Sequence, residues 1–263
     1  MLNLAQTRLL AAFAGPTLGA MLLAAPAQHK PQPRRPAPPK SVELFVPFHA
    51  AEVFEYRVQW SKLVNAASVQ LAVTERRPFN GREAWHFRAQ ARTIDPMRYL
   101  FVLDDQFDSY AELATLTSLQ FEMYLREQGK REDVILPMSA EGDPAAGTGP
   151  AVRVLPGTRD ALGYLYYLRA VDWQQARETR APVFDGKKLY EARARLEVDR
   201  AEVTVPAGNY AASRIEVRVY ERGREVPQTH FWVWLAQDAR RTPVLLEAEI
   251  PFGTARVELT RAQ

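Results

Sequence analysis

The sequence has no cysteine among its 263 residues. This absence excludes disulfides, thiolate metal sites, a cysteine nucleophile and a cysteine-linked lipid anchor. The sequence also lacks the short motifs of zinc proteases, of serine hydrolases and of phosphate-binding loops. We therefore expect no metal, no cofactor and no catalytic residue, and a fold that depends on its hydrophobic core.

A long apolar segment occurs only at the start of the chain, in residues 1–27. Arg8 is its single charge, Gly15-Pro16 interrupts it, and Ala25-Pro26-Ala27 matches a small-residue cleavage site. The pattern predicts a signal peptide cleaved after Ala27 and a periplasmic protein. The alternative is an uncleaved anchor, although a membrane span needs about 20 apolar residues. No later stretch is apolar enough, so we expect no transmembrane segment in the mature protein.

Residues 28–44 follow as a predicted linker. Five prolines and four bases lie in residues 28–40, a composition that favours an extended polyproline spacer. The segment is either a solvated linker or a basic tether to an anionic surface.

Excess positive charge is confined to this early part of the chain. The first 40 residues hold five of the 34 bases and no acid, so 29 bases face 31 acids in the rest. A nucleic-acid-binding domain needs a concentrated basic face. We therefore exclude nucleic acid as a partner of the predicted domain, residues 45–263.

Alternating apolar and polar residues dominate this domain and predict strands with one buried face. Asn80-Gly81 supplies the turn of a tight hairpin. Roughly ten such segments occur, which suggests that the sheet curls. They begin with Phe54, Tyr56, Val58 and Trp60, continue with Trp85, Phe87, Ala89 and Ala91, and end with residues 245–250 and 255–259.

Residues 158–173 are the one convincing amphipathic helix. Thr158 is placed to cap its first turn, and Asp160 and Arg169 lie near opposite ends of its dipole. Because these two charges are nine residues apart, we expect them on different faces and not paired. The predicted fold is mainly β, a curved antiparallel sheet or open β-barrel of roughly ten strands wrapped around one α-helix.

Four stretches of the chain resemble a bacterial exported family catalogued as domain of unknown function 3108. They read DALGYLYYLR from Asp160, FDGKKLYEARAR from Phe184, VTVPAGNYAASRIE from Val203 and WVWLAQDARRTPVLLEAEIPFG from Trp232. The likeness runs from about Glu52 to Leu259. It implies an envelope location and a β-rich fold, and it implies no reaction.

Aromatic residues on the helix and on one later strand are the candidate ligand-binding residues: Tyr164, Tyr167, Trp232 and Trp234. They form either an aromatic core or one wall of an apolar groove between helix and sheet. Small residues facing the same space leave room for an acyl chain, or else let the helix pack closely; these are Ala89, Ala91, Ala192 and Ala194.

The remaining polar candidates have simpler explanations. His86 and His230 lack a motif partner and are expected as surface or hydrogen-bonded histidines. Asp104, Asp105 and Asp108 lack the glycine and distal glutamate of a calcium loop, so we expect a solvated acidic turn.

Three functional hypotheses follow. The first is non-enzymatic binding of an apolar envelope molecule or a partner peptide in the groove. The second is a structural or assembly factor of the envelope that acts on a protein partner through an exposed sheet edge. The third, a hydrolase, requires a deep pocket in which His86 or His230 reaches a carboxylate.

Overall fold

The computed structural model describes residues 44–61, 63–140, 151–250 and 253–263. The predicted signal peptide, residues 1–27, and all of the predicted linker except Leu44 lie outside these residues. In the described part of the chain, no helix combines the length and the hydropathy that a bilayer span requires.

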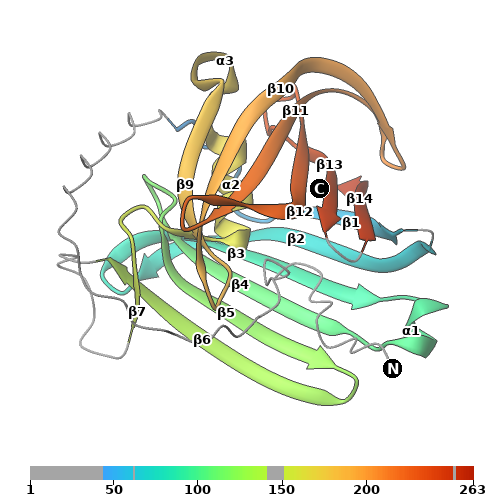
Figure 1. Cartoon of the computed structure of the whole chain (residues 1–263), viewed down its shortest axis with the longest axis horizontal. Coiled ribbons are helices and arrows are strands. Elements are labelled where there is room, and N and C mark those ends of the chain that lie inside the picture. The colour runs from blue at the N-terminus through green and yellow to red at the C-terminus, as the bar shows by residue number, and fades with distance from the viewer. Residues whose placement is uncertain (1–43, 62, 141–150, 251–252) are drawn as a thin grey trace, which may run out of the picture.

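Fourteen strands and three helices make up the described residues (Figure 1). The strands are β1 (Glu52–Trp60), β2 (Leu63–Phe79), β3 (Arg82–Thr93), β4 (Asp104–Glu112), β5 (Ser118–Glu127), β6 (Lys130–Ala140), β7 (Val152–Val154), β8 (Arg159–Asp160), β9 (Glu178–Phe184), β10 (Leu189–Val205), β11 (Gly208–Glu221), β12 (Arg224–Ala236), β13 (Pro243–Ile250) and β14 (Gly253–Ala262). The helices are α1 (Met97–Leu100), α2 (Ala161–Ala170) and α3 (Trp173–Ala176).

All the strands belong to one curled sheet that does not close. Its order is β7-β6-β5-β4-β3-β2-β1-β14-β13-β12-β11-β10-β9-β8. Neighbouring strands are antiparallel except at the two edges, where β7 runs parallel to β6 and β8 runs parallel to β9. The mainly β prediction is confirmed, whereas a purely antiparallel sheet of roughly ten strands around a single helix is wrong.

Four strands were not predicted from the sequence, because their residues lack clear alternation of apolar and polar side chains. They are β4, β7, β8 and β9. β7 and β8 have only three and two residues, too few for any periodic signal. β9 contains Pro182, which usually argues against a strand. β4 opens with two aspartates and resembled an acidic turn. By contrast, the hairpin between β2 and β3 is confirmed, with Asn80 and Gly81 both at positive φ.

Helix α2 is shorter than predicted and begins after a different cap. Asp160 is the N-cap residue, and its carboxylate accepts a hydrogen bond from the Gly163 amide. Thr158 instead donates its hydroxyl to the Leu155 carbonyl, so its predicted capping role is wrong. The Asp160 carboxylate also accepts hydrogen bonds from Ser109 on β4 and Ser118 on β5, at 2.6 and 2.5 Å. The cap therefore joins the helix to the sheet.

The face of the sheet that packs on α2 is called here the inner face. The rings of Phe87 and Tyr166 stack on each other there, with centroids 3.8 Å apart. The opposite, outer face carries charged side chains in cross-strand rows. One such row pairs Arg57, Glu258 and Arg256. Alternation along the strands thus separates an apolar interior from an ion-paired exterior.

Arg169, at the far end of α2, is almost fully buried and is paired with Glu52 of β1. Their side chains are 1% and 0% exposed. Two hydrogen bonds of 2.7 and 3.0 Å join the guanidinium to the carboxylate, and a third, of 2.9 Å, reaches the Arg240 carbonyl. The expectation that Arg169 serves only the helix dipole is therefore wrong. Asp160 and Arg169 do lie apart, as predicted.

Removing one member of this pair leaves an uncompensated buried charge. We predict that Arg169→Met lowers the free energy of unfolding by about 3–5 kcal/mol, measured by urea denaturation. The double variant Glu52→Leu, Arg169→Met loses less than the sum of the two single losses. The exposed Arg180 is the matched control, and Arg180→Met changes stability little. Equal stabilities of Arg169→Met and the wild type would contradict this account.

Candidate functional site

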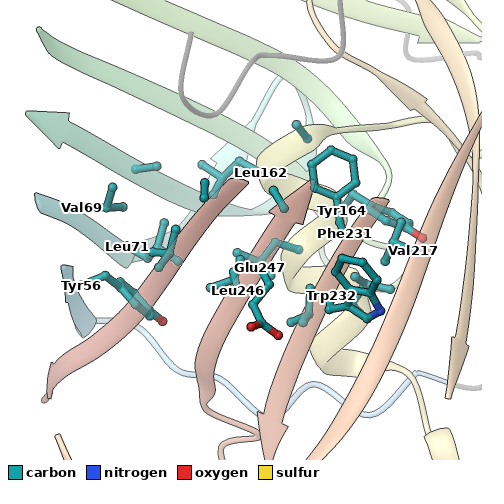
Figure 2. A pocket seen from close by; sticks show the side chains of 18 of the residues that line it. Tyr56, Val69, Leu71, Leu162, Tyr164, Val217, Phe231, Trp232, Leu246 and Glu247 are labelled. Atoms are coloured by element: carbon teal, nitrogen blue, oxygen red, sulfur yellow. The ribbon is translucent and has the colours of Figure 1, made fainter. Parts of the chain in front are cut away.

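An apolar groove with a volume of about 180 Å³ lies between α2 and the inner face of the sheet. Figure 2 shows Tyr56, Val69 and Leu71 at one end, and Tyr164, Phe231 and Trp232 at the other. The lining residues are Tyr56, Trp60, Val69, Leu71, Ala89, Phe107, Phe121, Ala161, Leu162, Tyr164, Leu165, Leu168, Val217, Phe231, Trp232, Val233, Leu246, Glu247, Ala248, Ile250, Ala255 and Val257.

The groove is covered on one side and open on the other. Helix α2 packs over β3 and β4, where Ala89 and Phe107 are 1% and 3% exposed. On β13 and β14, the lining residues Leu246, Ala248 and Val257 are only partly buried. The space between helix and sheet is therefore not filled by the described residues, and the inner face of β13 and β14 remains accessible.

Two of the four candidate binding residues line the groove. They are Tyr164 on α2 and Trp232 on β12. Tyr167 shares a hydrogen bond of 2.6 Å with Thr179, and the Arg159 guanidinium lies over its ring. Its interactions are thus those of a packed core residue.

Trp232 and Trp234 share one face of β12, as the alternation predicts, but that face is the outer one. Their cross-strand partners on β11 are Glu216 and Arg214, and Arg214 lies over both indole rings, at 4.9 and 5.4 Å from the centroids. The Trp234 indole donates to Glu247. Trp234 is therefore outside the groove, and Trp232 lines it from a strand whose inner side chains are Phe231 and Val233.

Of the four small residues expected to leave room, only Ala89 lines the groove; Ala91, Ala192 and Ala194 do not. The sequence reasoning also missed Leu165, Leu246, Ala248 and Val257. Helical spacing had placed Leu165 on the apolar face of the helix, and the other three lie in segments predicted as strands. The strand order, which sequence alone did not supply, brings them together opposite the helix.

The groove presents almost no polar chemistry. Burial raises the pKa of the Tyr164 phenol, and the buried hydroxyl has no hydrogen-bond partner among the described residues. Glu247 is the one charged residue among the described lining residues, and it is held by Arg256 and Trp234. The groove can therefore hold an apolar molecule. Its described lining residues include no pair of side chains aligned for proton transfer or nucleophilic attack.

His86 and Asp108 form a buried pair on the outer face. The His86 Nε2 atom lies 2.6 Å from the Asp108 carboxylate, which also accepts from Arg88 at 2.8 Å. Burial alone would raise the pKa of Asp108, but the hydrogen bonds from His86, Arg88 and Gln106 lower it below its ordinary value. His86 stacks on Tyr110 and does not line the groove. The pair therefore lies outside the groove.

The predicted acidic turn is instead part of strand β4, so that expectation is wrong. Asp104 pairs with Arg98, and Asp105 accepts a hydrogen bond from the Arg126 amide. His230 lies 3.3 Å from Glu225. No group of three or more metal-ligating side chains converges within the described ranges.

The chain is similar to one protein family and to several solved structures. The family described as "Protein of unknown function (DUF3108)" matches residues 55–260, close to the span of the sequence resemblance. No curated protein matches the chain. Among solved structures, a β-barrel-like protein of domain of unknown function DUF1849 from Brucella abortus is similar, with a TM-score of 0.52 and 10% identity over 82% of this chain and 98% of that one. This likeness concerns the fold alone.

Two weaker structural matches are also known. One is a candidate lipoprotein from Parabacteroides distasonis, with a TM-score of 0.40 and 10% identity over 85% of this chain and 100% of that one. The other is a candidate exported protein with a YmcC-like fold from Bacteroides fragilis, with a TM-score of 0.36 and 10% identity over 84% of this chain and 99% of that one.

The lowered pKa of Asp108 predicts part of the response to acid. A carboxylate with a depressed folded-state pKa stabilises the protein above the ordinary Asp value of about 3.9 and loses that contribution as pH falls through the folded-state pKa. We predict that the urea midpoint falls between pH 5 and pH 3, and that Asp108→Asn makes the fall smaller. Glu202→Gln, which changes an exposed carboxylate on β10, is the control. An unchanged pH slope in Asp108→Asn would contradict the assignment.

Proposed function

The chain belongs to the DUF3108 family of proteins of unknown function, and from this premise we propose that it is a non-enzymatic envelope protein whose groove binds the acyl chain of a lipid or a similar apolar molecule. The observation that carries the proposal is the partly open, almost wholly apolar space between α2 and β12–β14. An apolar surface that stays accessible to water favours occupation by an apolar ligand.

The size of the groove fits part of a chain-like ligand. An engineered apolar cavity of about 150 Å³ binds benzene, and the groove, at about 180 Å³, is of this order. A longer chain would continue along the accessible inner face of β13 and β14. The lining offers few directional hydrogen bonds, so shape and apolar area would decide which ligand binds.

The envelope location rests on the sequence. The export signal predicted in residues 1–27 supports periplasmic delivery after cleavage behind Ala27. An acyl-chain ligand suits that compartment, since lipids of the two membranes border it.

The assembly-factor hypothesis is the second candidate, because one sheet edge is exposed. Among the described residues, strand β6 pairs with β7 only over Met138–Ala140, which leaves its first eight residues without a strand partner on that side. That edge carries the charged run Lys130–Asp133 and Pro137, features that commonly prevent edge-to-edge pairing. We therefore place this function second.

Lipid extraction and mass spectrometry of the purified protein test the leading proposal. We predict co-purifying lipid, together with a change in tryptophan fluorescence on delipidation, because Trp60 and Trp232 line the groove.

Ala248→Phe, which fills the groove, lowers the affinity for a fluorescent fatty acid about tenfold or more.

Ala50→Phe is the matched control, since Ala50 is an exposed alanine outside the groove. It should bind the probe like the wild type. The lipid proposal fails if no lipid co-purifies and delipidation leaves the fluorescence unchanged.

Crosslinking in cells tests the second candidate. If β6 engages a partner strand, a photo-crosslinker at Ile135, which is 55% exposed, traps one envelope protein. The same crosslinker at the exposed Ala50 does not. A strictly monomeric product from Ile135 under every condition argues against an assembly role.

A further inference from the structure

The connection between β3 and β4 carries the two most exposed large hydrophobic side chains of the described residues. It contains α1, where Tyr99 and Leu100 are 81% and 75% exposed. Met97 on the same short helix is partly exposed. These three residues are called here the apolar tip. Water-exposed apolar side chains clustered at a loop end commonly mark an interaction surface.

The apolar tip lies at one particular end of the groove. Strands β1 to β4 are consecutive antiparallel neighbours, so the β1–β2 and β3–β4 connections leave the sheet at the same end, as Figure 1 shows. The groove lining reaches this end through Trp60, the last residue of β1, and Ile250, the last residue of β13. The opposite end of the inner face is where α2 is anchored to Glu52 and Ser118.

The apolar lining of the groove also determines where the polar head group of a bound lipid would lie. No inner-face side chain among the described lining residues carries a charge, and burying an unpaired charge is costly. A charged head group would therefore remain outside, at the end away from the α2 anchors. That is the end where Trp60, Ile250 and the apolar tip lie.

The two arginines that flank the tip within the β3–β4 region are both paired with Asp104. Arg98 donates two hydrogen bonds to Asp104, of 3.0 and 2.7 Å, and Arg92 lies 3.6 Å from the same carboxylate. These two cations are already paired, so the tip itself offers apolar area and an aromatic ring to a partner. An aromatic and an aliphatic side chain side by side suit the interface of a bilayer.

We propose that the apolar tip inserts into the interfacial region of a lipid membrane and so presents the open end of the groove to lipid. This inference rests on the proposed function, since it assigns the membrane as the surface with which the groove exchanges its ligand. Insertion depends on apolar contact, so it requires no anionic lipid.

The absence of cysteine makes a direct test possible, because an engineered cysteine is the only labelling site. Leu100→Cys is labelled with an environment-sensitive fluorophore and mixed with phosphatidylcholine vesicles. Leu155→Cys is the matched control, since Leu155 is 55% exposed and follows β7, near the opposite end of the sheet. We expect a blue shift and a rise in intensity for the label at Leu100 and none for the label at Leu155.

Vesicle co-sedimentation of unlabelled protein gives an independent measurement. The double variant Tyr99→Ser, Leu100→Ser should lower the vesicle partition coefficient about tenfold or more, and Leu155→Ser should leave it unchanged. Both variants should keep the wild-type far-UV circular dichroism and the wild-type affinity for a fluorescent fatty acid in solution. If the wild-type protein does not bind the fatty acid but still inserts into vesicles, the groove proposal is overturned and the tip remains a membrane contact.

Three results would overturn the inference. The first is an equal signal from the two labels, or none from either. The second is binding only to phosphatidylglycerol vesicles that salt abolishes, since the contact would then be electrostatic. The third is a concentration-dependent shift without vesicles, accompanied by a dimer in sedimentation, which would make the tip a contact between two copies of this chain.

Discussion

The buried pair of Arg169 and Glu52 fixes where the central helix lies. It joins the end of α2 to the start of β1 across 117 positions of sequence, in an interior where an unpaired charge would be costly. At the other end of α2, Asp160 binds Ser109 and Ser118, and a side chain at Gly163 would meet both serine hydroxyls at about 3 Å. Anchored at both ends, the helix covers β3 and β4 and leaves the inner face of β13 and β14 accessible.

The groove is thus a consequence of how the helix is held. A curled sheet with one apolar face needs an element to cover that face, and a ten-residue helix is too short to cover fourteen strands. The outer face needs no cover, because cross-strand pairs such as Arg57 with Glu258 and Arg256 with Glu247 satisfy its charges. The His86 and Asp108 pair lies on this outer side. The polar groups on the inner side, Arg169, Glu52 and Asp160, are used to anchor the helix. The rest of the inner side is apolar surface, and this surface is the basis of the proposed binding role.

Alternation along the chain predicted the mainly β fold, and the turn residues Asn80 and Gly81 predicted the hairpin between β2 and β3. It failed where a tertiary partner decides the outcome. In the sequence, Asp108 resembles a solvated residue, but in the fold His86 and Arg88 bind its carboxylate. In the sequence, Arg169 resembles a residue that only complements the helix dipole, but in the fold it is paired with Glu52. Trp232 and Trp234 were correctly placed on one face of a strand, but which face points inward depends on the register with β11. For the groove, Tyr164 was found from its residue type, while Leu246, Ala248 and Val257 depended on strand order.

The central claim is that an apolar chain occupies the space between α2 and β12–β14. Methyl NMR spectra recorded with a nitroxide-labelled fatty acid locate such a chain directly. The account predicts paramagnetic broadening of the Leu165, Leu246 and Val257 methyl signals, with Leu155 and Ile135 unaffected. Uniform weak broadening of exposed methyl groups, with the groove signals left sharp, would contradict it.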